Sequence, residues 1–312
     1  MTTRGLPLLL ACGLLALALA MPPLSWSRRS YDFLAVFDIT QSMGVADYRL
    51  DGRPASRLDF ARQALREALP RLPCGSRVGL AAFTEYRSLM LLAPIEVCEH
   101  YNDLLATLEQ LDGRMRWADA SQVSKGVYWA LRAARDIGDE PRLLFFSDGH
   151  ESPPIEGEGP ALFGDITRGQ IGGLIVGTGD LAPSPIPKVD PSGRSRGVWS
   201  ADEVAQGLDP DRRSEHLSGL RETHLQGLAA RTGLGYVRLE DAAGLTAAMR
   251  DPQLARTREL PTDLTWMPVA LALAAVCWPA LAGVLRARRN RLPATTDGAI
   301  RNRAKTSQSH HP

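Results

Sequence analysis

The chain has 312 residues, of which 36 are lysine or arginine, 35 are aspartate or glutamate, and 44% are hydrophobic. This length suffices for one large domain or two ordinary ones with a well-buried core. The nearly balanced charge offers no domain-wide basic stripe to neutralise phosphates, so we expect no nucleic acid partner.

The first 27 residues are typical of an export signal. A basic start at Arg4 precedes an apolar core at residues 6–17 and small residues at 18–20, which suit a signal peptidase. A longer apolar segment, residues 6–24, would instead form an uncleaved signal anchor. Both alternatives export the part of the chain that follows.

An oxygen-rich motif follows the first apolar strand of the exported part. Residues 33–37 are apolar and lie between Asp32 and Asp38, which predicts a short strand buried on both faces of a sheet. Asp38, Thr40 and Ser42 then alternate, so an extended loop would point their oxygens to one side. Such oxygens suit Mg²⁺ or Ca²⁺, although a loop that merely caps the next helix remains the alternative.

Two later segments supply matching oxygens. Residues 142–146 form another short apolar strand that runs into Asp148 and Gly149, and a loop with Ser121 leads into a helix that contains Gly126. Open α/β sheets bind ligands at the carboxyl ends of their strands, so we expect these side chains to converge.

With these three elements, the chain resembles the von Willebrand factor A (VWA) family. The metal-ion-dependent adhesion site of that family combines Asp-x-Ser/Thr-x-Ser, a threonine five residues before a helix glycine, and a strand ending in Asp-Gly. Here Ser121 takes the place of the usual threonine, and Asp119 offers a competing oxygen. The cation ligands that the resemblance implies are Asp38, Thr40, Ser42, Ser121 and Asp148.

The resemblance also implies a fold and a mode of binding. The fold would be a doubly wound α/β domain over residues 30–250, with a mostly parallel sheet and one antiparallel edge strand. A divalent cation, Mg²⁺ or Ca²⁺, would hold a carboxylate from a partner protein. The alternative is a VWA fold whose site is vestigial.

Hydrophobic periodicity places the other elements. A capping box at Ser56 and Asp59 starts the first helix of the domain. The strands at 76–85 and 88–97 form a hairpin that carries the antiparallel edge strand. Further helices are expected at 102–111, 124–137, 224–231 and 242–250, and further strands at 170–177 and 235–239.

A proline-rich segment, residues 181–219, interrupts this regular order. Its prolines predict irregular structure or a small hairpin, with residues 186–189 against 197–200. A minimal VWA domain has no insertion of this length. Long ordered loops often carry function, so the insertion is a candidate partner contact; a surface embellishment is the alternative.

Cysteine usage fits export. Cys12 and Cys277 lie in hydrophobic segments, which leaves Cys74 and Cys98 as the only pair in the globular part. An oxidising compartment permits a disulfide between them, and two buried free thiols are the alternative. Neither cysteine has metal-ligand spacing, so we expect no zinc site.

The C-terminal part predicts membrane attachment. Residues 251–263 form a linker, and residues 264–286 a transmembrane helix, because residues 266–285 carry no charge over about 30 Å of helix. The arginine-rich tail, residues 287–312, is expected in the cytoplasm by the positive-inside rule. The VWA domain would then lie in the periplasm, anchored to the inner membrane.

The expected function is binding rather than catalysis. Two carboxylates and three hydroxyls leave a divalent cation with an open position for a partner's carboxylate. By resemblance, membrane-tethered bacterial VWA proteins act as assembly or maturation factors. The alternatives are a metal-dependent hydrolase using His150 or Glu151, and an anchored solute receptor, which would need a deep apolar pocket.

A closer resemblance is to the MxaL type of VWA protein. The segments that carry it are residues 37–43, 73–88 and 173–188. That group belongs to methanol-oxidation clusters and is linked to calcium insertion into periplasmic methanol dehydrogenase. The resemblance implies that the partner is methanol dehydrogenase or one of its accessory proteins.

Overall fold

The computed structural model describes residues 5–22, 24–139, 141–154, 164–207, 213–262 and 264–289. The chain divides into two compact units, residues 27–258 and the two chain ends. Of the expected basic tail, residues 287–312, the part from residue 290 onward lies outside the described residues.

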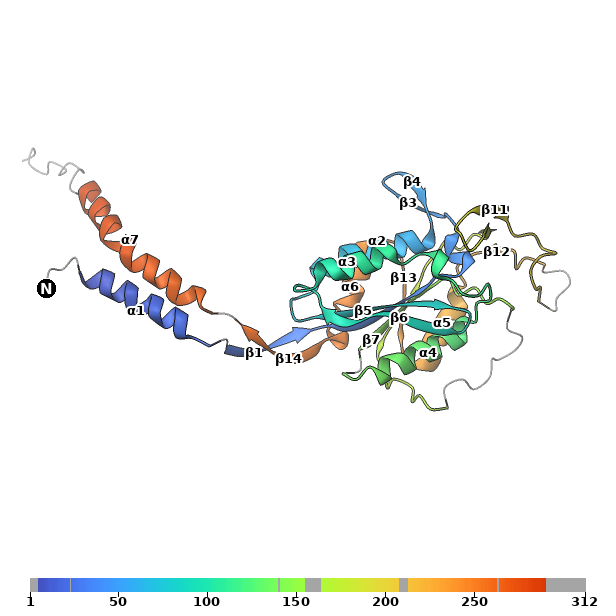
Figure 1. The fold of residues 1–312 in the computed structure, drawn as a ribbon, viewed down its shortest axis with the longest axis horizontal. Coiled ribbons are helices and arrows are strands. Elements are labelled where there is room, and N and C mark those ends of the chain that lie inside the picture. Colours follow the sequence, from blue (N-terminus) through green and yellow to red (C-terminus); the bar gives the residue numbers. More distant parts are fainter. Residues whose placement is uncertain are drawn as a thin grey trace, which may run out of the picture. The chain divides into compact units, whose positions relative to one another are not determined.

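A six-stranded sheet forms the centre of the larger unit (Figure 1). All neighbouring strands run parallel except the edge strand β6, which is antiparallel to β5. The predicted mostly parallel sheet with one antiparallel edge is therefore confirmed. In spatial order the strands are β13 (Gly235–Arg238), β8 (Gly173–Gly177), β7 (Arg142–Ser147), β2 (Asp32–Asp38), β5 (Arg77–Thr84) and β6 (Arg87–Glu96).

Helices cover both faces of this sheet, which explains why its central strand is apolar throughout. Every residue of β2 is buried, as expected for a strand packed on two sides. One apolar cluster lies under α2 (Arg57–Ala68), α3 (Tyr101–Gln110) and α6 (Ala242–Met249). The other lies under α4 (Val123–Asp136) and α5 (Glu222–Thr232).

Local interactions fix where α2 begins and how closely α4 packs on the sheet. The Ser56 hydroxyl accepts a hydrogen bond from the Asp59 backbone N–H at 3.0 Å and donates to the Asp59 carboxylate at 2.7 Å, so the predicted cap of α2 is present. Gly126 lies where α4 meets the Phe83 ring of β5, and a Cβ at this position would overlap that ring. The glycine is needed for close helix-to-sheet packing.

The described part of the insertion forms short antiparallel pairs. β10 (Pro187–Val189) pairs with β11 (Ser195–Val198), close to the predicted hairpin, and β9 (Ser184–Pro185) pairs with β12 (Leu217–Ser218). Another small hairpin, β3 (Tyr48–Leu50) with β4 (Arg53–Ala55), fills the polar stretch before α2. Single turns of 3₁₀ helix complete the domain at Gln41–Gly44, Leu69–Arg71, Gly113–Met115 and Pro252–Leu254.

The chain ends are more regular than the sequence predicts. Within the smaller unit, α1 (Leu6–Ala20) and α7 (Trp266–Arg289) pack against each other. β1 (Leu24–Ser30) and β14 (Arg256–Thr262) form a two-stranded sheet. The segment expected to be a linker, residues 251–263, thus contains a strand, since pairing with β1 orders a sequence that has no strong pattern of its own.

The membrane span expected at residues 264–286 is not confirmed. Helix α7 forms at this position, but no helix within the described residues combines the length and the apolar character that a bilayer crossing requires. Pro279 lies inside α7, and the helix continues into the arginine-rich residues 286–289.

Cys74 and Cys98 are joined in a disulfide, with their Cα atoms 5.4 Å apart. The bond links the turn that precedes β5 to the segment that follows β6. It therefore closes the open end of the β5–β6 hairpin.

Candidate metal centre

The loop after β2 turns its polar side chains toward one another. Asp38 is fully buried, and its Oδ1 accepts hydrogen bonds from the Thr40 backbone N–H at 3.0 Å and from the Thr40 hydroxyl at 2.6 Å. The Thr40 and Ser42 hydroxyl oxygens lie 3.3 Å apart. Three oxygen-bearing side chains thus come together, although through the 3₁₀ turn Gln41–Gly44 rather than the extended loop expected from the sequence.

The end of β7 meets the end of β2 because the two strands are neighbours in register. Ser147 follows the residue paired with Phe37, and its hydroxyl donates to Asp38 Oδ2 at 2.7 Å. Burial and the nearby charge of Asp148 raise the pKa of Asp38 to about 7. Hydrogen bonds therefore hold both oxygens of Asp38 in place, while burial makes ionisation of this carboxyl group unfavourable.

Asp148 is engaged by a buried arginine. The Arg57 guanidinium lies 2.6 Å from Asp148 Oδ2, and both side chains are fully buried. The Ser218 hydroxyl donates to the same carboxylate oxygen at 2.8 Å, and the His150 backbone N–H donates to Oδ1 at 3.0 Å. The other side of the guanidinium faces Asp47 at 2.7 Å. Protein groups thus occupy both oxygens of Asp148.

Burial and charge act in opposite directions on this cluster. Burial alone would raise the pKa of Asp148, but the positive charge of Arg57 lowers it overall, so Asp148 is a carboxylate. Burial lowers the pKa of His150. A neutral imidazole is therefore the form of His150 that the site favours.

Ser121 approaches the site from the loop between α3 and α4. Its backbone N–H donates to Ser152 O at 2.8 Å, and it forms a bridge with Glu85 at the end of β5. Its side chain is buried, yet its Oγ has no hydrogen-bond partner within the described residues. A buried hydroxyl without a partner is unfavourable unless a ligand or water satisfies it.

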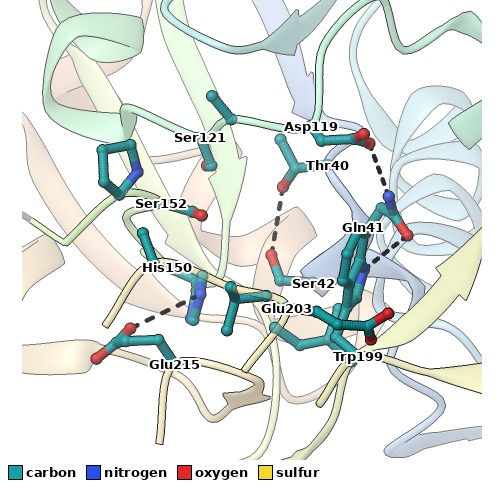
Figure 2. A pocket seen from close by; sticks show the side chains of 15 residues that line it. Thr40, Gln41, Ser42, Asp119, Ser121, His150, Ser152, Trp199, Glu203 and Glu215 are labelled. Carbon is teal, nitrogen blue, oxygen red and sulfur yellow. Dashed lines mark hydrogen bonds and ion pairs between the residues drawn. The ribbon is translucent and has the colours of Figure 1, made fainter. Parts of the chain in front are cut away.

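These hydroxyls face a cavity of about 330 Å³. Figure 2 shows Thr40, Ser42 and Ser121 along its wall together with His150. The carboxylates of Asp38 and Asp148 are buried and do not line the cavity. The insertion supplies the opposite side, with Ile186, Trp199, Glu203, Val204, Ala205 and Glu215.

Gln41 connects the motif loop to the insertion. Its Oε1 accepts hydrogen bonds from the Val189 backbone N–H and from the Trp199 indole N–H, both at 3.0 Å. Its Nε2 donates to Asp119 Oδ1 at 2.7 Å (Figure 2). The same Asp119 oxygen also accepts a hydrogen bond from Arg116 at 3.0 Å. The carboxylate that competes with Ser121 as a cation ligand is therefore already bonded to protein groups.

His150 and Glu151 point to different partners. The imidazole of His150 lines the cavity and lies 3.9 Å from Glu215. The carboxylate of Glu151 instead accepts from the Ser124 N–H at 2.8 Å and lies 3.1 Å from His224. The two residues therefore do not form the acid/base pair that their adjacency in the sequence allowed.

The family model for the von Willebrand factor type A domain matches residues 33–150. This range begins in β2 and ends just beyond Asp148, so it contains all three parts of the oxygen cluster. This segment of the chain is similar to a VWA domain. No curated protein matches the sequence.

Solved structures share the fold of this domain at low sequence identity. An aerotolerance-related membrane protein from Bacteroides fragilis, crystallised with multiple mutations to serine, is 17% identical, with a TM-score of 0.53 over 70% of this chain and 96% of that one. BatB, a conserved hypothetical protein from Bacteroides thetaiotaomicron, is 18% identical, with a TM-score of 0.50 over 70% of this chain and 95% of that one. Such likeness shows the fold alone.

Sequence reasoning missed several residues that hold the VWA site together. Arg57 is one turn before Ala61 and lies on the apolar stripe of α2, and an arginine on such a stripe signals a buried ion pair. Ser147 directly precedes Asp148 at the strand end. Ser218 and Trp199 come from the insertion, and the sequence gives no signal that pairs either with the motif.

The oxygen atoms at the site suit a hard divalent cation, but the net charge of the site suits it less well. Thr40, Ser42 and Ser121 present neutral oxygens to one cavity, and Asp38 stands directly behind Thr40. The unpartnered Ser121 hydroxyl also favours a ligand. Against this, the Arg57 charge already compensates Asp148, which leaves the site with less net negative charge than two free carboxylates would supply.

Proposed function

We propose that this VWA domain binds a divalent cation at the cavity lined by Thr40, Ser42 and Ser121. Asp38 would act through the hydroxyl that it orients, or through a water, rather than by direct contact. Asp148, which is paired with Arg57, would contribute its charge without direct contact with the cation. The observation that carries the proposal is the buried Ser121 hydroxyl, which has no protein partner within the described residues and faces the same cavity as the other two hydroxyls.

The bound cation would hold a carboxylate from a partner protein. Neutral hydroxyl ligands leave a cation electrophilic, so it gains from adding an anionic oxygen. The insertion confines the approach to this position, because Trp199 and Glu215 line the opposite side of the cavity. A protruding acidic side chain therefore suits the cavity better than a broad flat surface does.

The partner follows only from the closer resemblance. The expectation that methanol dehydrogenase or an accessory protein is the client, and that the protein acts in its maturation, belongs to this proposal. Export of the domain is also part of this proposal. The disulfide between Cys74 and Cys98 supports it, because disulfides persist in oxidising compartments. Attachment to the inner membrane stays a prediction from the sequence.

Calorimetric titration of the full-length protein with Mg²⁺ and Ca²⁺, after removal of metal with EDTA, tests the cation. We expect one site per chain, and the Asp38→Ala and Ser121→Ala variants to weaken it. Affinity capture of partners from membranes and from soluble fractions, with and without EDTA, then tests the cation-dependent contact. Equal capture in both conditions contradicts the proposal.

A hydrolase is the competing function, and one observation favours it. The neutral His150 imidazole lines the cavity beside the candidate cation position, and its Nδ1 has no partner within the described residues. The His150→Ala variant separates the two functions. We expect it to retain cation-dependent partner binding; hydrolysis of a test ester by the wild type that this variant loses would favour the enzyme instead.

A further inference from the structure

A second concave surface lies at the far end of α2 from the candidate cation site. It is a groove of about 890 Å³ between the C-terminal part of α2, α6 and the start of the domain. Arg66 is nine residues beyond Arg57 along the helix, which corresponds to about 14 Å at 1.5 Å rise per residue. The groove and the cation cavity share no lining residue.

Four exposed arginines surround this groove against a single acidic residue, Glu67. We call it the arginine groove and define its rim by Arg29, Arg66, Arg71 and Arg250. Glu67 accepts a hydrogen bond from the neutral Gln63 amide at 2.8 Å and keeps its single negative charge, which the four arginines outnumber. The rim is therefore strongly positive.

These guanidinium groups differ from many others in the domain because they lack a carboxylate partner among the described residues. Arg62, Arg77 and Arg116 each face a carboxylate at 3.0 to 3.2 Å. In contrast, none of the four rim guanidinium groups has a hydrogen-bond or ion-pair partner among the residues that the structure describes. Like charges gathered without counter-charges repel one another, and an anionic ligand would relieve that repulsion.

The lining of the groove is mixed in polarity, and the alanines of α6 form part of its apolar surface. α6 contributes small side chains, including Ala243 and Ala247, which let another backbone come close. Tyr31 lies beneath, only 7% exposed, and its hydroxyl donates to Arg250 O at 2.9 Å. A ligand that fits must combine negative charge at its edges with an apolar surface facing α6.

We propose that the arginine groove binds an acidic amphipathic segment of a partner protein, independently of the cation. Such a segment would place its carboxylates on the arginine rim and its apolar side chains on the alanines of α6. A single-stranded nucleic acid would need exposed aromatic rings for base stacking, whereas of the two tyrosines that line the groove Tyr31 is buried and Tyr101 is only partly exposed. A membrane surface would meet a concave face, whereas a segment of chain can enter it.

The test measures binding of a dye-labelled peptide to the full-length protein in detergent, in the presence of EDTA so that the cation site plays no part. The probe is a helical peptide with glutamates along one face and leucines along the other, compared with the same peptide carrying glutamines. We expect the glutamate peptide to bind at least tenfold more tightly, and its affinity to fall with added salt. Equal binding of the two peptides overturns the proposal.

Charge-reversal variants locate the site. Arg66→Glu combined with Arg250→Glu removes two rim charges, and we expect at least tenfold weaker peptide binding. Arg168→Glu combined with Arg231→Glu makes the same charge change at exposed arginines outside the groove. An equal loss in both double variants overturns the proposal, because it would reflect net charge alone.

Vesicles distinguish a lipid from a protein partner. Liposomes containing phosphatidylglycerol are sedimented with the wild type and with the Arg66→Glu/Arg250→Glu variant, each reconstituted from detergent in the same way. We expect no difference between them. Groove-dependent association with these liposomes, without groove-dependent binding of the acidic peptide, would overturn the assignment to a protein segment.

Discussion

The guanidinium of Arg57 lies 2.6 Å from the carboxylate of Asp148, and neither side chain is exposed to solvent. Each charge has lost its hydration on burial, so each depends on the other for compensation. At the proposed cation site, this pair places a fixed positive charge next to one of the acidic residues. How much of the Asp148 charge a metal can use therefore depends on Arg57.

Replacing Arg57 with methionine leaves Asp148 buried without its counter-charge. We expect a loss of about 3–5 kcal/mol in the free energy of unfolding, measured by denaturation in EDTA. Adding Ca²⁺ or Mg²⁺ is expected to recover more stability in this variant than in the wild type, because the freed carboxylate can then face the metal. Arg62→Met is the matched control, since its partner Asp59 is largely exposed; an equal loss in both variants would contradict the buried pair.

Ser121→Ala tests whether the unpartnered hydroxyl serves a ligand. Its Oγ makes no hydrogen bond within the described residues, so removing it leaves no protein partner unsatisfied. We expect an unchanged midpoint of thermal unfolding in EDTA and about tenfold weaker cation binding by titration calorimetry. The Ser88 hydroxyl is also buried and has no hydrogen-bond partner among the described residues. Ser88→Ala is the control, and a cation affinity that drops equally there would contradict the assignment.

The raised pKa of Asp38 predicts how the metal-free protein responds to pH. Burial, with the charge of Asp148, raises this pKa from 3.8 to about 7. Stability from this group is therefore complete below pH 3.8 and is lost as pH rises through about 7, at about 1.4 kcal/mol for each pKa unit at most. In EDTA, we expect the stability of the wild type relative to Asp38→Asn to fall between pH 4 and pH 7. A difference that stays constant with pH would contradict the shift.

Gln41→Ala tests the connection between the motif loop and the insertion. The variant loses the hydrogen bonds to the Val189 N–H and the Trp199 indole, both 3.0 Å long. We expect trypsin to cleave the exposed β11 strand at Arg196 several-fold faster, followed by mass spectrometry of the fragments. Gln63→Ala on α2 serves as the control. Unchanged cleavage in Gln41→Ala would show that other contacts hold the insertion.

Reduction of the Cys74–Cys98 disulfide is expected to destabilise the domain. The two cysteines are 24 residues apart, and closing a loop of that length contributes about 3 kcal/mol in the chain-entropy account. We expect the Cys74→Ser/Cys98→Ser variant and the wild type in reductant to share one lowered unfolding midpoint. A further drop when reductant is added to the variant would indicate a different cause.

The sequence predicts the sheet well because its signals are local. The apolar run of β2 and the capping box of α2 each depend on a few adjacent residues, and both appear as expected. The hydroxyls of the motif loop also come close together, but through a 3₁₀ turn and not an extended loop. Parallel neighbours then bring the ends of β2 and β7 together, since adjacent strands in register share an edge. The convergence of Asp38 with Asp148 follows from that topology.

Contacts between distant segments were harder to predict. The bond between Arg57 and Ser218 joins residues 161 positions apart, and nothing near either residue specifies the other. The same holds for Gln41 and Trp199, which are 158 positions apart. The pairing of β14 with β1 likewise orders a stretch whose local pattern predicts only a linker.

Gln41 occupies a variable position of the Asp-x-Thr-x-Ser motif, yet its amide joins the motif loop, the insertion and Asp119. Transplanting residues 181–219 onto a related scaffold would therefore carry the insertion without its anchor. A working chimera would have to move this glutamine together with the graft. Gln41 and the insertion must therefore be moved together in protein engineering, although almost 140 residues separate them along the chain.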